Sequence, residues 1–303
     1  MEKKILRVGH SPDPDDAFMF YGLAFNYVKM DDYKIEHVLE DIQSLNVRAM
    51  KGELEVTAIS AHVYPYVQDK YYIMRTGASM GIGYGPVLIG KENYSLSELK
   101  NKKIAHPGDY TTAILLAKIY LDDFIPVAMP FDEIMNAVQN GEVDAGIIIH
   151  EGQITYNQFG FKKILDFGEV WHKETNLPLP LGLDVVRKDL GFEMAQKISQ
   201  KLRESIEYGY KNLNDAVTYA LKFGRGLNYE LGEKFIKMYV NDLTIDMGVE
   251  GEKALKLLYD KAFEKNFIPE KVDVFLVWNS LTNYEIFRNN QKIKTNKMES
   301  KNE

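Results

Sequence analysis

The sequence predicts an α/β protein built as two lobes, with a ligand cleft between them. Short apolar runs alternate with amphipathic segments up to about residue 187, a pattern typical of α/β folds. Two segments read as crossovers between lobes, one near residues 86–104 and one at residues 168–182, where prolines favour a stiff, extended chain. Clefts between domains are the usual position of small ligands. A single continuous α/β sheet is the alternative that this pattern leaves open.

Strands are predicted where short apolar or β-branched runs lie between turn residues. They are Ile5–Gly9, Tyr33–Leu39, Val56–Ser60, Tyr71–Thr76, Pro86–Gly90, Lys103–Ala105, Ile125–Met129, Ala145–His150 and Leu183–Arg187. Helices are predicted where the apolar residues recur with a helical period, and two of these helices are followed by a glycine, at Gly52 and Gly141. The helices are Ala17–Tyr27, Ile42–Lys51, His62–Val67, Ser95–Leu99, Thr111–Phe124 and Phe131–Asn140.

Beyond Gly191 the pattern changes to amphipathic helices without strands between them. These helices are Ala195–Tyr210, Leu213–Phe223, Tyr229–Tyr239 and Glu250–Phe263. We therefore assign residues 1–90 and 183–284 to a discontinuous large lobe and residues 91–182 to a small lobe. Residues 285–303 form a polar tail, rich in Asn and Lys, for which we expect fraying or disorder.

Composition excludes several classes of protein. The 303 residues include 37 Lys and Arg against 44 Asp and Glu, a net charge of −7, whereas a nucleic-acid-binding protein normally carries a basic surface. There is no cysteine, which excludes disulfides, thiolate metal sites and a cysteine nucleophile. We expect a small-molecule carboxylate as the partner, and neither nucleic acid nor membrane. The oligomeric state stays open.

The N-terminal segment bears on localisation. A secretory signal has an apolar stretch of roughly 7–15 residues. Met-Glu-Lys-Lys is followed instead by a short strand and a Pro/Asp cluster, and no run approaches the length of a membrane span. We expect a cytoplasmic protein.

The first candidate site lies directly after the first predicted strand. Asp13, Pro14, Asp15 and Asp16 form a good helix start, with Asp13 as the N-cap. However, three carboxylates in four residues repel one another, and the carboxyl end of a strand is a usual ligand position in α/β sheets. Capping and substrate binding both stay open here. On the second interpretation Ser11, Asp13 and Asp16 contact the substrate.

Two further segments place hydroxyl groups where a helix begins. In the first, Ala58, Ile59 and Ser60 end a strand, and in the second, Thr111 and Thr112 follow a glycine turn. The free N–H groups of a helix start bind anions, which suits a carboxylate ligand. Helix capping alone is the alternative for both segments.

The sharpest candidate is His150, at the end of the buried run Ala145–Ile149. A histidine there would face the cleft, and its ordinary pKa near neutrality allows it to take and return a proton. A structural role is the alternative. The six histidines show no metal-ligand spacing, so we expect neither a metal nor another cofactor.

Together these segments resemble the 1,4-dihydroxy-6-naphthoate synthase family of menaquinone biosynthesis, over about residues 5–278. The most specific part runs from Ile-His-Glu-Gly-Gln-Ile-Thr-Tyr at 149–156, through Asp-Phe-Gly-Glu-Val-Trp at 166–171, to Thr-Asn-Leu-Pro-Leu-Pro-Leu-Gly at 175–182. One departure is clear, since many members read Ser-Pro-Cys-Pro-Asn-Asp where this chain has Ser-Pro-Asp-Pro-Asp-Asp at 11–16.

The resemblance implies a fold like that of type II periplasmic solute-binding proteins. It also implies a lyase that converts cyclic dehypoxanthinyl futalosine to 1,4-dihydroxy-6-naphthoate and dihydroxyacetone, without a cofactor. The family's proton acceptor corresponds to His150, and its Ser and Thr segments bind the substrate. The alternatives are a non-catalytic cytoplasmic solute-binding or sensor protein of the same fold, and the related chorismate dehydratase.

Overall fold

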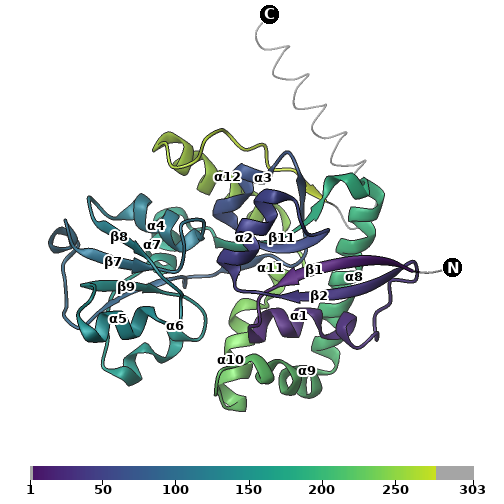
Figure 1. Cartoon of the computed structure of the whole chain (residues 1–303), viewed down its shortest axis with the longest axis horizontal. Helices are drawn as coiled ribbons and strands as arrows, with labels where there is room; N and C mark the ends of the chain where they lie inside the picture. The colour runs from purple at the N-terminus through teal and green to yellow at the C-terminus, as the bar shows by residue number, and fades with distance from the viewer. Residues whose placement is uncertain (1–2, 278–303) are drawn as a thin grey trace, which may run out of the picture.

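The computed structural model describes residues 3–277, so the predicted tail at 285–303 lies outside the described residues. Figure 1 shows two β-sheets side by side, each with its own helices. Within the described residues one sheet has seven strands and the other has five. The predicted two-lobed α/β class is therefore confirmed, and the alternative of one continuous sheet is wrong.

The larger sheet follows the order β12-β4-β11-β3-β1-β2, with β5 paired to β11. Its strands are β1 (Lys4–His10), β2 (Tyr33–Leu39), β3 (Val56–Ser60), β4 (Tyr71–Met74), β5 (Ser79–Gly81), β11 (Leu179–Arg187) and β12 (Leu276–Val277). Because β1 runs parallel to β3, the segments that follow them emerge at the same edge of the sheet. The antiparallel strand β11 brings the chain back between β3 and β4 after the smaller sheet is complete.

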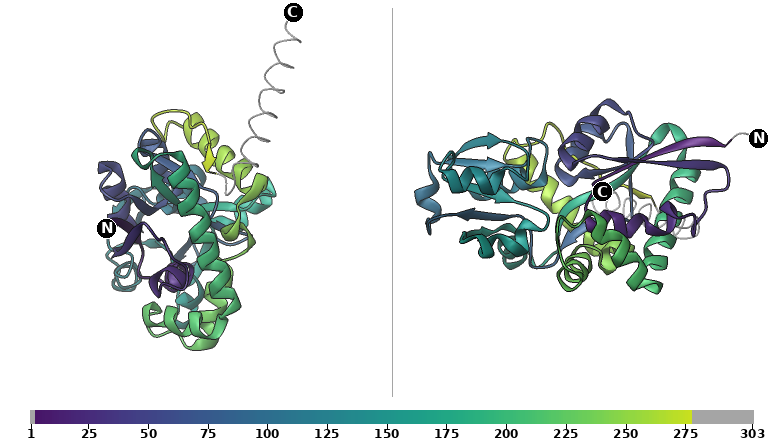
Figure 2. Two further views of the ribbon diagram at one scale, coloured as in Figure 1. Left: turned by 90° about the vertical axis from the view of Figure 1, so that its right-hand side faces the viewer. Right: turned by 60° about the horizontal axis from the view of Figure 1, so that its bottom comes forward.

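The helices of this lobe come from both halves of the chain. They are α1 (Pro14–Ala24), α2 (Ile42–Lys51), α3 (Tyr64–Val67), α8 (Phe192–Lys211), α9 (Leu213–Ala220), α10 (Tyr229–Tyr239), α11 (Asp242–Ile245) and α12 (Gly248–Glu264), with 3₁₀ turns at Ala61–Val63, Lys188–Leu190 and Leu221–Phe223. Figures 1 and 2 show the late helices α8, α9 and α10 gathered around the early helix α1. Ser205 joins them: its hydroxyl donates to the carbonyl of Met19 at 2.7 Å and accepts from the N–H of Leu23 at 3.2 Å.

The smaller sheet follows the order β10-β6-β9-β7-β8. Its elements are β6 (Val87–Gly90), β7 (Lys103–His106), α4 (Thr112–Tyr120), β8 (Ile125–Ala128), α5 (Ile134–Asn140), β9 (Ala145–Ile148), α6 (Gly152–Thr155), β10 (Lys162–Asp166) and α7 (Phe167–Thr175), with 3₁₀ turns at Leu96–Leu99 and Tyr156–Phe159. Here β7 and β9 are parallel, so the residues after each strand meet at one edge. Strand β6, which ends at Gly90, pairs within the smaller sheet. The division into lobes at residues 90 and 182 stays a prediction.

Several predicted elements differ from the observed ones. The segment 167–175 is helix α7 rather than extended chain, and the buried Trp171 donates from its ring to the carbonyl of Pro178 at 2.9 Å. The crossover becomes extended only after Asn176, whose left-handed φ of 54° ends α7. Similarly, the strand β9 ends at Ile148, two residues before the expected end at His150.

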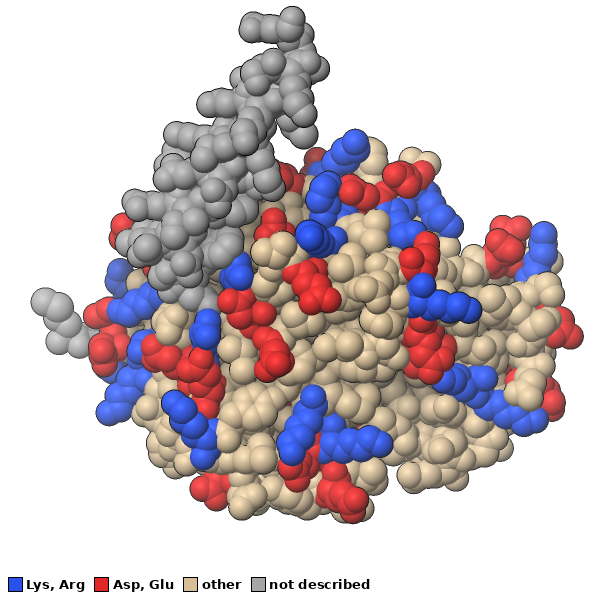
Figure 3. Space-filling model, turned by 180° about the vertical axis from the view of Figure 1, so that it is seen from behind, with Lys and Arg blue, Asp and Glu red and all other residues tan. Residues whose placement is uncertain are grey.

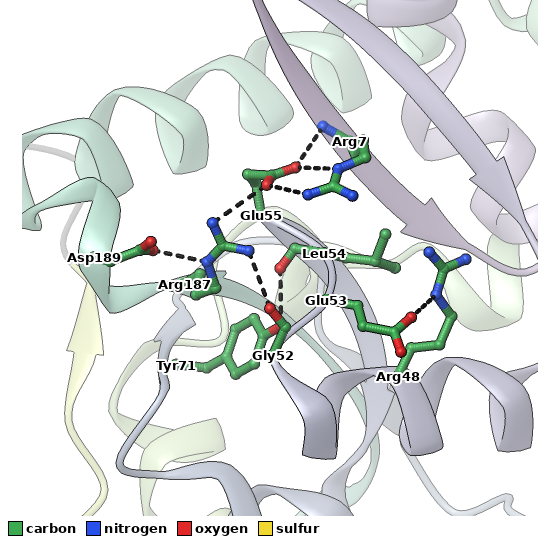
Figure 4. A network of polar contacts seen from close by, with 9 residues as sticks. All are labelled: Arg7, Arg48, Gly52, Glu53, Leu54, Glu55, Tyr71, Arg187 and Asp189. Atoms are coloured by element: carbon green, nitrogen blue, oxygen red, sulfur yellow. Dashed lines mark hydrogen bonds and ion pairs between the residues drawn. The ribbon is translucent and has the colours of Figure 1, made fainter.

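A network of polar contacts joins β1 and β11 to Glu55, the residue just before β3 (Figure 4). Glu55 accepts three hydrogen bonds from Arg7, on β1, at 2.7–3.0 Å, and lies 3.3 Å from Arg187, on β11. Burial raises the pKa of Glu55, but the hydrogen bonds and charges of Arg7 and Arg187 outweigh it and hold the pKa below its usual range. The network therefore fixes β3, which carries Ser60 at its other end.

Exposed charges of both signs are mixed on one face of the molecule. Figure 3 shows Lys and Arg side chains interspersed with Asp and Glu over the face seen from behind. No helix of residues 3–277 has the length and apolar character needed to cross a membrane.

Candidate active site

A cavity of about 120 Å³ lies where the carboxyl ends of strands from both sheets face one another. On the same measure, one water molecule needs roughly 10–15 Å³, so the cavity has room for a small organic ligand. Eight of the nine predicted site residues line it: Ser11, Asp16, Ala58, Ile59, Ser60, Thr111, Thr112 and His150. The ninth, Asp13, is buried and is not among the residues that line the cavity.

His150 approaches the cavity from the smaller sheet. It follows β9 with a φ of 55°, in the left-handed region that side chains other than glycine seldom adopt. Its Nδ1 lies 3.2 Å from Oδ2 of Asp13, which belongs to the loop after β1 in the other lobe. The negative charge of Asp13 beside Nδ1 favours a proton on that nitrogen, which leaves the second ring nitrogen, Nε2, as a base on a residue that lines the cavity.

Asp13 stands at the N-cap position of α1, but its side chain makes no capping hydrogen bond. Instead, its carboxylate contacts His150 and accepts a hydrogen bond of 2.7 Å from Arg225. Burial raises the pKa of Asp13, but the charges of His150 and Arg225 and the hydrogen bond from Arg225 oppose burial, and the pKa is held below its usual range. The capping alternative for Asp13 is therefore wrong, and its placement fits a residue that orients His150.

Arg225 makes a second link between Asp13 and the smaller lobe. The same nitrogen that donates to Asp13 lies 3.0 Å from Oε2 of Glu151, the residue after His150. The guanidinium also lies over the ring of Phe131 at 4.8 Å, and that ring meets His150 edge-on at 4.8 Å. Asp13 and Arg225 from one lobe thus interlock with His150, Glu151 and Phe131 from the other.

Ser60 is held by a buried amide that sequence reasoning missed. Asn46, on α2, donates to the Ser60 hydroxyl at 3.0 Å and accepts from the Ser60 N–H at 2.8 Å. Ser60 makes no side-chain cap to the 3₁₀ turn that follows it. Because its oxygen already accepts from Asn46, the Ser60 hydroxyl can donate its proton to a ligand in the cavity.

The paired threonines open helix α4, as predicted, but their hydroxyl protons are engaged. Thr111 donates to the carbonyl of Gly108 at 2.8 Å, and Thr112 donates to the carbonyl of Leu181 at 2.7 Å. The first N–H groups of α4, at Thr112 and Ala113, have no acceptor within the helix. These two residues also line the cavity, so their N–H groups fit an anion better than the hydroxyls do.

Three carboxyl groups lie at the larger lobe's side of the cavity: Asp15, Asp16 and Asp184. Asp16 accepts from the N–H and the hydroxyl of Ser11 at 2.6 and 2.7 Å. Burial raises the pKa of Asp16 to about 6, although these hydrogen bonds oppose the shift. Burial, together with Asp16 and Asp13, raises the pKa of Asp15 well above its usual range.

Other lining residues come from parts of the chain with no local sign of a site. Tyr239, on α10, donates to Gln153 at 2.5 Å, and burial raises its pKa well above the usual range. Tyr239 and Asp184, which line the cavity, do not lie in a sequence motif, and neither does Arg225, which contacts Asp13. Among residues 3–277, no group of three or more His, Asp or Glu side chains is arranged to hold a metal ion.

The fold and the cleft define a protein of the periplasmic-binding-protein-like class. The alkanesulfonate-binding protein of Xanthomonas axonopodis, solved with MOPS bound, has a TM-score of 0.67 at 14% identity, covering 90% of this chain and 97% of its own. A crystal structure of a protein from Archaeoglobus fulgidus matches more strongly. Its TM-score is 0.84 at 49% identity, and the match covers 87% of this chain and 98% of that one.

Sequence comparison gives the family. The model of a family described as menaquinone biosynthesis matches residues 6–264. A 1,4-dihydroxy-6-naphtoate synthase of Thermus thermophilus is 37% identical over 257 residues, covering 85% of this chain and 93% of the relative. A second protein of that name, from Streptomyces coelicolor, is 32% identical over 275 residues, with 89% and 96% covered. The chain belongs to this family of menaquinone-biosynthesis proteins, which confirms the resemblance found in its sequence.

Proposed function

We propose that this protein is a carbon–carbon lyase that converts cyclic dehypoxanthinyl futalosine to 1,4-dihydroxy-6-naphthoate and dihydroxyacetone. The observation that carries the proposal is the contact between Nδ1 of His150 and Asp13, beside a cavity lined by residues of both lobes. A carboxylate that fixes one ring nitrogen prepares the other as a general base. The two relatives carry the name of this activity over most of their length.

The proposed reaction begins when Nε2 of His150 takes the proton of a hydroxyl on the sugar-derived part of the substrate. The electron pair of that oxygen forms the carbonyl of the departing fragment, and the adjacent C–C bond breaks. Its electrons pass to the ring ketone as an enolate, which takes up a proton and becomes the aromatic hydroxyl. Formation of the aromatic ring drives the reaction forward, and a positioned base contributes about 10²–10⁴-fold to the rate.

The substrate's carboxylate would lie at the opposite side of the cavity. Ser60 offers a hydroxyl proton there, and the start of α4 offers the N–H groups of Thr112 and Ala113. These donors carry no full charge, so they can hold an anion without a paired cation.

The test is incubation of the purified protein with cyclic dehypoxanthinyl futalosine, followed by mass detection of 1,4-dihydroxy-6-naphthoate. Chorismate is offered in a parallel reaction. Formation of the naphthoate supports the proposal. Binding of the futalosine derivative without turnover would favour a sensor, and consumption of chorismate alone would favour a dehydratase, so either result would overturn it.

A further inference from the structure

Asn46 is a fully buried polar residue that contacts the cavity lining without belonging to it. It lies on α2 and is 0% exposed, whereas Ser60, which it contacts, lines the cavity. Its amide offers one oxygen and two N–H groups, and all three have a partner. Oδ1 accepts from the N–H of Ser60 at 2.8 Å, and Nδ2 donates to the Ser60 hydroxyl at 3.0 Å and to the carbonyl of Tyr110 at 3.3 Å.

These contacts allow only one orientation of the amide. A backbone N–H can only donate and a backbone carbonyl can only accept, so Ser60 requires Oδ1 beside its N–H and Tyr110 requires Nδ2 beside its carbonyl. Asn46 therefore gives a proton to the Ser60 hydroxyl and cannot take one from it. A hydroxyl that accepts in this way directs its own proton elsewhere, and within residues 3–277 no protein group accepts it. The Ser60 proton is left for a ligand.

The same amide joins the two parts of the anion subsite, by which we mean the Ser60 hydroxyl and the N–H groups of Thr112 and Ala113. Ser60 ends β3 in the larger sheet, whereas Tyr110 lies between β7 of the smaller sheet and α4. Gln43, one turn before Asn46 on α2, accepts from the Tyr110 N–H at 3.2 Å. Both backbone polar groups of Tyr110 are thus held by α2, next to the helix start that carries the other donors of the subsite.

Gly108 allows this loop to approach α2 so closely. Its φ is +137°, which favours glycine, and a Cβ placed on it would overlap the side chain of Gln43. A side chain at position 108 would therefore push the loop away from α2, and with it the contact between Tyr110 and Asn46.

We propose that Asn46 is a positioning residue of the anion subsite, which turns the Ser60 proton toward the ligand and holds the donors of both sheets at one place. The inference rests on the proposed function for the identity of the anion, which is the carboxylate of substrate and product. With an acceptor in place of the Asn46 N–H groups, the Ser60 hydroxyl would donate to the protein, and the subsite would lose a donor for the carboxylate.

The test measures by calorimetry, in the absence of oxygen, the binding of the product 1,4-dihydroxy-6-naphthoate and of 1,4-dihydroxynaphthalene, which lacks the carboxylate. Asn46→Asp keeps the shape of the side chain but replaces a donor by an acceptor, so it should raise the Kd for the product roughly 10-fold or more. Asn46→Ala leaves the Ser60 hydroxyl able to rotate and should raise this Kd less, by about 3-fold. The Kd for dihydroxynaphthalene should stay within about 2-fold in both variants.

The order of the two variants separates positioning from a structural role. A structural role predicts the larger loss for Asn46→Ala, which removes more of the side chain, and equal losses for the two ligands. Asn241→Asp is the matched control, because Asn241 also accepts from a backbone N–H and donates to two oxygens but does not line the cavity. Its Kd for the product should stay within about 2-fold of the wild type.

A double-mutant cycle gives a second measurement. In a Ser60→Ala background, Asn46→Ala should change the product Kd by less than about 2-fold, because the hydroxyl on which Asn46 acts is absent. An unchanged product Kd in Asn46→Asp, a larger loss in Asn46→Ala, or equal losses for both ligands overturns the inference. If Asn46→Asp does not fold, the cycle decides alone, and additive effects overturn the inference. These Kd values need no turnover, so a failure of the proposed function is read separately, as a wild type that forms no naphthoate.

Discussion

Nδ1 of His150 lies 3.2 Å from Oδ2 of Asp13, although the two residues follow strands of different sheets. We propose that this contact makes Asp13 a positioning residue for the base, while its role as a ligand of the substrate stays a prediction.

We expect Asp13→Asn to lower kcat by about 10–100-fold, the range typical of partners that orient a functional histidine. The KM should stay within about 2-fold, because Asp13 does not line the cavity. Asp13→Cys should keep more activity than Asp13→Ala, since a sulfur can still accept from the ring. A large rise in KM at constant kcat would instead show that Asp13 binds the substrate.

His150→Ala should reduce turnover by about 10²–10⁴-fold, because it removes the proposed base. The fold should be intact, since His150 lies outside the strand β9 and packs at the surface of the cleft. Single-turnover kinetics measure the loss of rate, and circular dichroism checks that the fold is intact. A variant that keeps a rate near that of the wild type would remove His150 from the mechanism.

Ser60→Ala should weaken the binding of substrate and product alike, by roughly 10-fold, since both carry the carboxylate. The Ser60 N–H keeps its bond to Asn46, so the local backbone should not change. Calorimetric Kd values for the product provide the measurement. An effect on the substrate alone would place the carboxylate elsewhere in the cavity.

The pH dependence of stability should report on Glu55. Its pKa is lower in the folded protein than in the unfolded chain, so its contribution is present above the unfolded value of about 4.5 and is lost as the pH falls through the folded value. At pH 7, Glu55→Gln should lower the free energy of unfolding by about 1–3 kcal/mol. Urea titrations at pH 7 and at pH 3 should show the difference between variant and wild type shrinking in acid. If the difference in unfolding free energy between variant and wild type were the same at both pH values, the effect would come from packing and not from the charge of Glu55.

The sequence alone predicted much of the site, because most of its residues follow strand ends. Ser60 is the last residue of β3, and Thr111 and His150 lie a short way after β7 and β9. Parallel strands bring such positions to one edge of a sheet. The same reasoning predicted two lobes from two crossovers, but it placed extended chain where α7 forms.

Sequence reasoning missed several residues of the candidate site for a physical reason. Asp184 lies inside an apolar strand, and Tyr239 lies on an amphipathic helix where a buried tyrosine is ordinary. Arg225 stands in a turn between helices, more than two hundred residues from Asp13. Tertiary packing brings Asp184 and Tyr239 to the cavity and Arg225 to Asp13, and no local spacing encodes it. The side-chain direction of Asp13 was also beyond the sequence, because an N-cap position permits both a capping bond and the contact with His150.

The contact network of Asp13, Arg225, His150 and Glu151 makes reactivity conditional on how the lobes meet. Each ion pair from Asp13 or Arg225 to His150 or Glu151 joins a group of one lobe to a group of the other. Separating the lobes would break the contact that orients the proposed base, and bringing them together would restore it. On the proposed mechanism the base is therefore oriented only when both halves of the cleft are in place, and a form with the lobes apart would lack it.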